Sequence, residues 1–162
     1  IVTASREDFL NLEVVHDEVY LSEIIQSIKT YYRDKLSVVH TEFEVAEIPE
    51  CLMKGDKNRL IEVLQNIMEN AIKYGDGKSI RIYGEDEEDC KLIHIENSGC
   101  SLKEEELTNL FDSFYRGSNS HAVKGNGLGL YICKNLMRKM DGAVFAQIKG
   151  ESFRVTVVCR KA

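Results

Sequence analysis

The rest of the chain is organised around the sequence NRLIEVLQNIMENAIKYG, residues 58–75. At about 100° per residue, the angle of an α-helix with 3.6 residues per turn, it predicts a helix with distinct sectors. The first sector is a broad apolar face made of Leu60, Ile61, Leu64, Ile67, Met68, Ala71 and Ile72. A second sector, Glu62, Gln65 and Glu69, is expected to face solvent. The apolar face must pack on a sheet or another helix, and Asp56 is the expected N-cap.

The third sector of this helix carries polar side chains in register. Asn66, Asn70 and Lys73 stack at i, i+4 and i+7, with Tyr74 beside them on the edge of the apolar face. An Asn inside a helix lowers the stability of the helix by roughly 0.5 kcal/mol or more relative to Ala. Two stacked Asn residues therefore indicate that their side chains have a function. Hydrogen bonds to a neighbouring loop explain the seam equally well. Only Asn70 and Lys73 together suggest a metal ion and a phosphate.

Length and composition set broad limits. A chain of 162 residues with 43% hydrophobic residues is long enough for one compact domain with a core. The net charge of -6 argues against a general nucleic-acid or anionic-membrane surface. No apolar run approaches the ~20 residues of a spanning helix, and no signal peptide is visible, so a soluble, intracellular domain is expected. The scattered, odd number of cysteines predicts reduced thiols rather than a zinc site or disulfides.

The remaining elements follow from periodicity and turn residues. We expect an edge strand (13–20), a helix (21–35), a strand (37–45), a hairpin (79–84 and 90–96), a short helix (107–114), a helix (128–140) and two strands (143–147 and 153–159). Ser22 is the expected N-cap of the first helix. The small-residue, polar segment 118–124 is a candidate lid. Helices interleaved with mostly antiparallel strands predict helices layered on one face of a sheet.

A glycine cluster, Gly125-Asn126-Gly127-Leu128-Gly129-Leu130, opens the helix over 128–140. Glycines let backbone N–H groups approach a phosphate closely, and the helix N-terminus adds about half a positive charge. The cluster therefore favours anion binding, with a flexible turn as the alternative. It is not a dinucleotide fingerprint, because Leu130 stands where a small residue is needed, and it is not a Walker loop, because no GK[ST] follows.

Four motifs in this order resemble the N, G1, F and G2 boxes of sensor histidine kinase catalytic domains. They are Asn66-x-x-x-Asn70-Ala71-x-Lys73-Tyr74, Glu96-Asn97-Ser98-Gly99, Phe111-Asp112-Ser113-Phe114-Tyr115-Arg116-Gly117 and Gly125-x-Gly127-Leu128-Gly129-Leu130. The resemblance implies an α+β fold, a two-layer α/β sandwich of the Bergerat type shared with gyrase, Hsp90 and MutL ATPases. Its mixed, mostly antiparallel sheet is covered on one face by about three helices, and an ATP lid closes the site. Residues 13–162 would form this ATP-binding domain, and residues 1–12 would be a remnant of a preceding dimerisation region or linker.

The resemblance also implies a role for each matching residue. Asn70 would ligate Mg²⁺, a hard ion that takes oxygen ligands. Lys73 and Arg116 would neutralise phosphate charge, and with Asn66 they form the implied catalytic set. The implied nucleotide-binding set is Asn66, Asn70, Lys73, Tyr74, Asn97, Gly99, Phe111, Arg116, Gly125, Gly127, Leu128, Gly129 and Leu130. Within it Tyr74 would lie along the base or ribose, and Phe111 would either anchor the lid or pack in the core.

Two residues depart from the family pattern. Asn97 stands where Asp is usual, and Ser101 stands where a second Gly is usual. Because an amide carries both a donor and an acceptor, a flipping Asn97 side chain would meet either adenine or guanine. The expectation is a preference for ATP over GTP weaker by ~1 to 2 kcal/mol than with Asp.

The implied function is that of the ATP-binding catalytic domain of a two-component sensor histidine kinase. It would transfer the γ-phosphate of ATP to a His on a dimerisation domain, with a response regulator downstream. None of His16, His40, His94 and His121 stands in a phosphoacceptor pattern, so the fragment should not label itself. We expect a monomeric cytoplasmic domain whose parent is a homodimer anchored in the bacterial cell membrane.

Two other functions stay open. A gyrase-like or Hsp90-like ATPase needs a Glu where this chain has Asn66, and an amide does not accept a proton at neutral pH. A pseudokinase that regulates a partner by docking is favoured slightly by Asn97 and Ser101. The intact Asn70, Lys73 and Arg116 count against it.

Overall fold

The computed structural model describes residues 12–112 and 127–162. Over these residues the chain forms, in order, β1 (Asp17–Tyr20), α2 (Leu21–Val38), β2 (Glu42–Val45), β3 (Leu52–Gly55), α3 (Lys57–Tyr74), β4 (Ser79–Asp86), β5 (Cys90–Ser98), α4 (Glu104–Leu107), α5 (Gly127–Lys139), β6 (Ala143–Lys149) and β7 (Ser152–Arg160). The expected central helix, hairpin, last helix and last two strands are confirmed, with ends that move by at most two residues.

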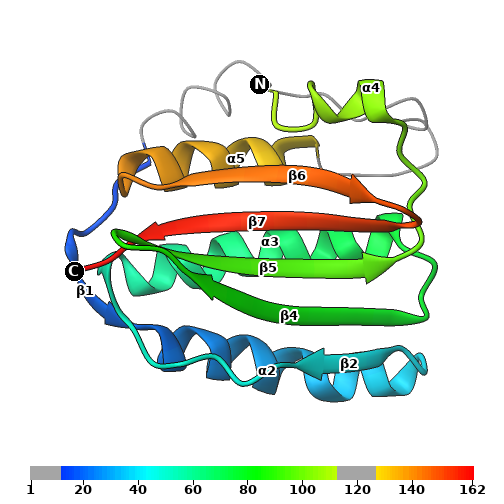
Figure 1. The fold of residues 1–162 in the computed structure, drawn as a ribbon, viewed down its shortest axis with the longest axis horizontal. Coiled ribbons are helices and arrows are strands. Elements are labelled where there is room, and N and C mark those ends of the chain that lie inside the picture. Colours follow the sequence, from blue (N-terminus) through cyan, green and yellow to red (C-terminus); the bar gives the residue numbers. More distant parts are fainter. Residues whose placement is uncertain (1–11, 113–126) are drawn as a thin grey trace.

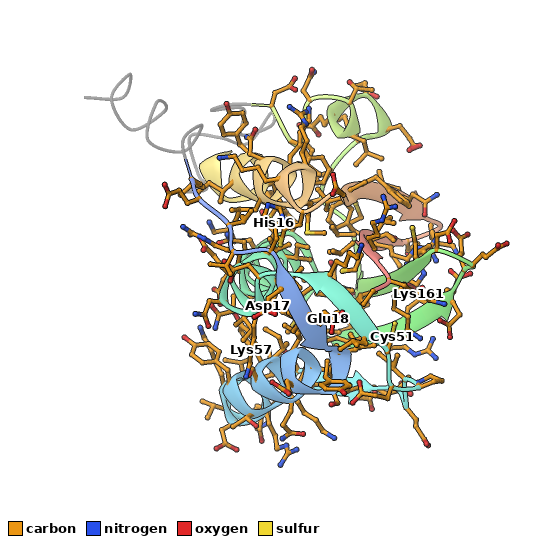
Figure 2. The ribbon with its side chains drawn as sticks, turned by 90° about the vertical axis from the view of Figure 1, so that its left-hand side faces the viewer. His16, Asp17, Glu18, Cys51, Lys57 and Lys161 are labelled. Atoms are coloured by element: carbon orange, nitrogen blue, oxygen red, sulfur yellow. The ribbon has the colours of Figure 1, made fainter. Side chains whose placement is uncertain are left out.

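The main sheet has five strands in the order β2-β4-β5-β7-β6. All neighbours are antiparallel except β2 and β4, which are parallel. Strands β1 and β3 form a separate antiparallel pair. Helices α2, α3 and α5 lie on one side of the main sheet, with α3 behind its centre (Figures 1 and 2). This arrangement confirms the predicted mixed, mostly antiparallel sheet covered on one face by helices.

The core lies between α3 and the inner face of the sheet. The strands contribute alternate apolar residues, fully or almost fully buried: Ile80, Ile82, Ile93, Ile95, Phe153, Val155 and Val157. Burying each such side chain contributes about 1.5–3 kcal/mol, so this layer is the main source of stability. Val63, which the sector division left out of the apolar face, is also fully buried. Helix α5 covers it, since the Cys133 thiol donates to the Val63 carbonyl at 3.5 Å.

Glu69, in the expected solvent strip of α3, is partly exposed and is also bonded to α2. The hydroxyl of the buried Tyr32 donates to the Glu69 carboxylate at 2.6 Å, and Lys35 pairs with the same oxygen at 3.3 Å. Both partners come from α2, which packs along this side of α3. Burial and the Glu69 carboxylate raise the pKa of the Tyr32 hydroxyl well above its usual range.

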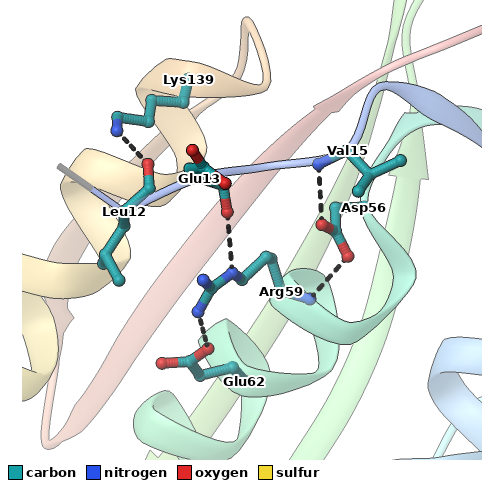
Figure 3. Close-up of polar contacts among 7 residues, drawn as sticks. All are labelled: Leu12, Glu13, Val15, Asp56, Arg59, Glu62 and Lys139. Atoms are coloured by element: carbon teal, nitrogen blue, oxygen red, sulfur yellow. Dashed lines mark hydrogen bonds and ion pairs between the residues drawn. The ribbon is translucent and has the colours of Figure 1, made fainter.

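The N-terminal end of α3 is capped as expected. One carboxylate oxygen of Asp56 accepts from the Arg59 amide at 3.2 Å. The other accepts from the Val15 amide at 2.8 Å, so a single side chain both starts the helix and holds the segment before β1 (Figure 3).

Two basic side chains hold the same N-terminal segment, residues 12–15. Arg59 Nε donates to the Glu13 carbonyl at 3.1 Å, while its Nη1 donates to Glu62 at 3.0 Å (Figure 3). Lys139, the last residue of α5, donates to the Leu12 carbonyl. The segment is therefore fastened to both α3 and α5, and only residues 17–20 of the expected strand over 13–20 are strand.

The start of α2 differs from the expectation that Ser22 is the N-cap. The helix begins at Leu21, and Tyr20 is the cap residue without a side-chain hydrogen bond. Ser22 lies in the first turn, where its amide and hydroxyl donate to the Glu50 carboxylate at 3.0 and 2.5 Å. A carboxylate from a distant loop thus satisfies the helix end, which no local pattern reveals.

The strand expected over 37–45 is wrong in its first half. Helix α2 continues to Val38, and His40 takes a left-handed conformation with φ 59°. The His40 amide bonds to the Ser37 carbonyl, and the Thr41 amide bonds to the Leu36 carbonyl, both at 3.0 Å. This is a Schellman ending. The β-branched Val38 and Val39 suggested a strand, but both are exposed at the helix end.

Two further elements differ from expectation. Of the short helix expected over 107–114, the described residues 108–112 form turns and a bend, and the helix seen nearby, α4, spans Glu104–Leu107. Leu110 is buried within these turns, so apolar spacing alone imitated a helix. Strand β3 was not predicted, because it is short and gains its partner, β1, only in the tertiary fold, where Met53 lies opposite Val19.

Candidate nucleotide-binding site

The C-terminal half of α3 carries the polar seam that the sequence singled out. Asn70 is buried, and its Nδ2 donates to the Asn66 carbonyl one turn earlier at 2.8 Å. Since the amide nitrogen is anchored in this way, the side-chain oxygen is the end that can meet a cation. Lys73, one turn further on, is exposed at the surface. The structure therefore keeps Asn66, Asn70 and Lys73 together on one helix face.

Asn66 links this helix to α5. Its side chain hydrogen-bonds to the buried Cys133 thiol. Burial raises the pKa of the Cys133 thiol well above its usual range, and the bond from Asn66 partly opposes that rise. Helix α5 begins at Gly127, in the glycine cluster. The Asn seam and the candidate phosphate-binding turn therefore belong to two helices in direct contact.

A tight turn after β5 packs on the loop that follows α3. Gly99 has φ 74°, and a Cβ there would lie 2.8 Å from Cβ of Asp76. The Ser98 hydroxyl donates to the Asp76 carboxylate at 2.6 Å, and the Asp76 amide donates back to the Ser98 carbonyl at 2.9 Å. The hydroxyl bond lowers the pKa of the Asp76 carboxyl group. Only glycine fits position 99.

Ser101 does not disturb this turn. Its amide and hydroxyl donate to the Tyr74 carbonyl at 3.3 and 3.4 Å, which ties the loop to the last residue of α3. The described non-glycine residues with positive φ are His40 and Asp141, so Ser101 carries no left-handed strain. The Tyr74 side chain is buried in the core. Its predicted contact with a base or ribose stays a prediction.

Asn97 is buried at the same end of α3. Its Nδ2 lies 2.7 Å from the place where a Cβ would stand on Gly75, the residue directly after the helix. Among the described residues its Oδ1 is buried without a hydrogen-bond partner. An unsatisfied buried acceptor is rare in folded proteins and needs an explanation, which a ligand with a hydrogen-bond donor provides.

The other predicted positions divide into described and undescribed ones. Gly127, Leu128, Gly129 and Leu130 form the first turn of α5, where Leu130 is part of the core. Phe111 is partly buried and packs against the core, which was one of its two expected roles. Arg116, Gly125 and the candidate lid over 118–124 lie outside the described residues.

Sequence reasoning missed the residues that support the site. Gly75, Asp76 and Ser98 hold the turn after β5 against the end of α3. The Gly and Asp residues in the sequence GDGK, residues 75–78, were the available signal, but they indicated only a turn. In the part of the chain that the structure covers, no group of three or more His, Cys, Asp or Glu side chains could hold a metal ion.

Two other features concern cysteines and membranes. All five cysteines carry free thiols, with Cys133 and Cys159 buried. Burial raises the pKa of Cys159 to about 12, so this thiol stays protonated. The described helices include none that is both long and apolar enough to span a bilayer.

The sequence matches a known protein family over most of its length. Residues 55–161 match the family described as histidine kinase-, DNA gyrase B- and HSP90-like ATPase. Two-component system protein A of Emericella nidulans is 33% identical over 138 residues, which cover 79% of this chain and 20% of that protein. The histidine-protein kinase BaeS of Escherichia coli is 34% identical over 95 residues, 57% of this chain and 20% of the kinase. The chain thus spans about a fifth of these relatives.

Solved structures of histidine kinases share the fold. The mycobacterial sensor histidine kinase MprB superposes with a TM-score of 0.79 at 22% identity, covering 90% of this chain and 98% of that one. The full-length kinase ShkA in complex with AMPPNP gives a TM-score of 0.82 at 18% identity, covering 99% of this chain and 36% of that one. The chain therefore belongs to the histidine kinase-, DNA gyrase B- and HSP90-like ATPase family, as an ATPase domain homologous to those of two-component sensor kinases.

Proposed function

We propose that this domain binds Mg-ATP and delivers the γ-phosphate to a His on a dimerisation domain of the same kinase. The observation that best supports this proposal is the Oδ1 atom of Asn97, which is buried beside the end of α3 and has no hydrogen-bond partner among the described residues. An acceptor in that position suits the amino group of adenine. Asn70 lies in α3, one turn before the end of the helix. The Asn97 and Asn70 side-chain amides therefore both lie near the C-terminal end of α3.

The side chains present fit the nucleotide and its metal ion. Mg²⁺ is usually held by few protein ligands together with substrate phosphates, and the Asn70 oxygen would be such a ligand. The ion would offset the phosphate charge and orient the γ-phosphate. Lys73 would add a positive charge from the exposed edge of the helix. Arg116 and Gly125 join the proposal only as sequence-based predictions.

Phosphoryl transfer is favoured over ATP hydrolysis. An ATPase of this family's gyrase kind would need a general base at position 66, and the Asn66 amide cannot take up a proton. The Asn66 side chain instead makes a hydrogen bond to the Cys133 thiol, which links α3 to α5. A His acceptor is already nucleophilic and needs no such base.

Neither His94 nor His16 makes a good phosphate acceptor. His94 is buried, with its ring nitrogens 2.6 Å from the Glu85 carboxylate and 2.8 Å from the Thr156 hydroxyl. His16 is exposed just before β1, next to Asp17 (Figure 2). It lacks the basic-Thr-Pro sequence of an acceptor segment. We therefore expect no acid-labile phosphate on the isolated domain after incubation with labelled ATP, and labelling of His16 would contradict this.

The partners follow from the same proposal. The histidine kinase ThkA has been crystallised with the response regulator TrrA, and its chain superposes on this one with a TM-score of 0.80 at 20% identity. We infer a response regulator as the downstream partner here too. The domain alone would be monomeric and cytoplasmic, within a homodimeric parent kinase that is anchored in the bacterial membrane.

The proposal is tested by comparing two buried amides that make the same local bond. Asn135 in α5 donates to the Tyr131 carbonyl at 2.9 Å, as Asn70 does to Asn66 at 2.8 Å. In calorimetric titrations with Mg-ATP, Asn70→Ala should lose at least about tenfold in affinity, because a bond to a charged group contributes about 1.5–3 kcal/mol. Asn135→Ala should bind like the parent protein. Equal affinity in Asn70→Ala and the parent would show that the site is wrongly placed.

A second experiment separates a kinase from a docking pseudokinase. The domain is mixed with labelled ATP and a separately made dimerisation segment of its parent. Acid-labile label on that segment, lost in Asn70→Ala and kept in Asn135→Ala, is expected of a kinase. Binding of Mg-ATP without any labelling would favour the pseudokinase.

A further inference from the structure

A groove runs between α2 and the edge strand β2. Two adjoining hollows, of about 470 and 330 Å³, share Lys29 and Val45 as lining residues, so they form one groove. Residues of α2 line one side, and β2 with the segment 46–48 lines the other. Helix α2 passes behind β2 and contacts it at this edge of the sheet (Figure 1). None of the described residues that line the groove belongs to the implied nucleotide-binding set.

Strand β2 has a free backbone edge beside this groove. It is the last strand of the main sheet, and its neighbour in the sheet is β4. The Glu42 and Ala46 amides donate toward β4, both at 2.9 Å. Because successive residues of a strand direct their backbone groups to opposite edges, those of Phe43 and Val45 point away from β4. Such an edge is a template for an added strand.

The end of the groove beside the C-terminal half of α2 is cationic. Lys29 and Arg33 stand one turn apart on α2, and His40 lines the same end just after the helix. Like charges one turn apart repel each other and destabilise a helix. The ion pairs between described residues include neither Lys29 nor Arg33. Two positive charges are therefore held together without an acidic partner among the described residues, in a protein with a net charge of -6.

The rest of the groove is apolar and only partly covered. Its hydrophobic lining residues are Ile25, Phe43, Val45 and Ile48, which pack on the core and still expose part of their surface. Removing this surface from water would favour the binding of apolar side chains. The groove therefore joins an apolar end to a cationic end along a free strand edge.

We propose that this groove binds an extended peptide segment that adds a strand beside β2 and carries acidic side chains. Backbone hydrogen bonds to Phe43 and Val45 would align the segment. Alternate side chains would then point toward α2, because side chains alternate between the two faces of a strand. These inward side chains would be acidic beside Lys29 and Arg33, and apolar beside Ile25. This binding surface does not depend on the proposed function.

A second copy of this chain fits the edge poorly. Glu42 and Glu44 are the exposed residues of β2, and they share the face of the strand that is turned away from α2. Two β2 strands paired antiparallel about a twofold axis would set these carboxylates against one another, which is destabilising. Lys29 and Arg33 would still lack acidic partners. A segment with acidic side chains on its inward face meets the charge of the groove and avoids the repulsion.

The test uses the synthetic peptides TETETVTV and VTVTETET, whose alternate residues place Glu at one end and Val at the other in either strand direction. In NMR titrations one of them should shift the Phe43 and Val45 amides. Its counterpart with Lys in place of Glu should bind at least about tenfold more weakly. Absence of binding, or shifts at Lys29 and Arg33 without shifts at Phe43 and Val45, would overturn the proposal. Shifts at these amides that follow protein concentration alone would also overturn it, because a second copy would then occupy the edge.

Two pairs of variants separate strand addition from charge attraction. Val45→Pro removes an N–H that points away from β4, so the fold should be kept, while peptide affinity should fall at least about tenfold below that of Val45→Ala. Lys29→Glu should weaken binding at least about tenfold. Lys149→Glu reverses an exposed charge on β6, at the opposite edge of the sheet, and should bind like the parent. Equal affinities within either pair would overturn the proposal.

Discussion

The two ends of α3 are built in opposite ways. At the N-terminal end Asp56 and Arg59 bond to residues 12–15 and to Glu62, so their side chains are used within the protein. At the C-terminal end lie Asn70 and the neighbouring Asn97, whose buried oxygen has no partner among the described residues. One end fastens the helix, and the other is the end at which we propose that nucleotide binds.

This difference separates stability from binding along a single helix. A side chain whose partners are all within the protein contributes to folding, and its removal should leave the affinity for nucleotide unchanged. A buried acceptor left without a protein partner lowers stability and is retained where a ligand uses it. If the two ends are independent, a substitution at either end should change stability or nucleotide affinity, but not both.

The largest effect is expected from Gly99→Ala at the C-terminal end. The left-handed φ of 74° and a Cβ only 2.8 Å from the Asp76 side chain should together cost about 3 kcal/mol of unfolding free energy. Gly77→Ala is the matched control, because Gly77 has φ 79° but nothing within 4 Å of its Cβ position. It should cost about 1 kcal/mol. Urea unfolding of both variants measures the difference, and equal costs would show that the turn is not tightly packed.

A smaller effect is expected from Asp56→Ala at the N-terminal end. Loss of the helix cap and of the Val15 amide's partner should lower the unfolding free energy by about 2 kcal/mol. The affinity of the folded protein for Mg-ATP should not change. Asp17→Ala is the control, because Asp17 is exposed and accepts only from the adjacent Glu18 amide. A drop in affinity in Asp56→Ala alone would mean that the two ends are not independent.

The smallest effect is expected from Ser98→Ala, and it depends on pH. The Ser98 hydroxyl lowers the pKa of Asp76 from its ordinary 3.8, so this carboxylate stabilises the fold above that pH and stops doing so as the pH falls through the lowered pKa. Parent and variant should therefore differ in stability at neutral pH and converge in acid. Carboxyl NMR titration should show a higher Asp76 pKa in Ser98→Ala. An unchanged pKa would contradict the bond.

Much of this molecule was predictable from its sequence because local and tertiary preferences agree. Local sequence and final structure agree in three places. Apolar residues repeat with the helical period in α3, buried and less buried residues alternate along much of β5, and residue 99, where the turn needs glycine, is glycine. Two of the failures occurred where a distant residue decides the local structure. Glu50 satisfies the start of α2 in place of a cap by Ser22, and β3 needs β1 as its partner.

The candidate site was found from its motifs, but its chemistry was not. Asn66 and Asn70 were identified by their spacing on the helix, and Asn97 by the motif in which it stands. The structure places Asn97 beside Gly75, directly after α3, with Asn70 one turn before the helix end and Asn66 one turn earlier. The orientation of the Asn97 amide depends on the Ser98 and Gly99 carbonyls. No sequence pattern specifies where backbone carbonyls point, so the orientation of this amide could be read only from the fold.

We propose that nucleotide binds at the C-terminal end of α3. Backbone NMR spectra recorded during titration with Mg²⁺ and a non-hydrolysable ATP analogue would locate the bound nucleotide residue by residue. We expect the largest shifts at the amides of Asn70, Asn97 and Gly99, with the amides of Val15 and Arg59 unchanged. Shifts confined to Val15 and Arg59, with none at the three residues of the proposed site, would contradict the account.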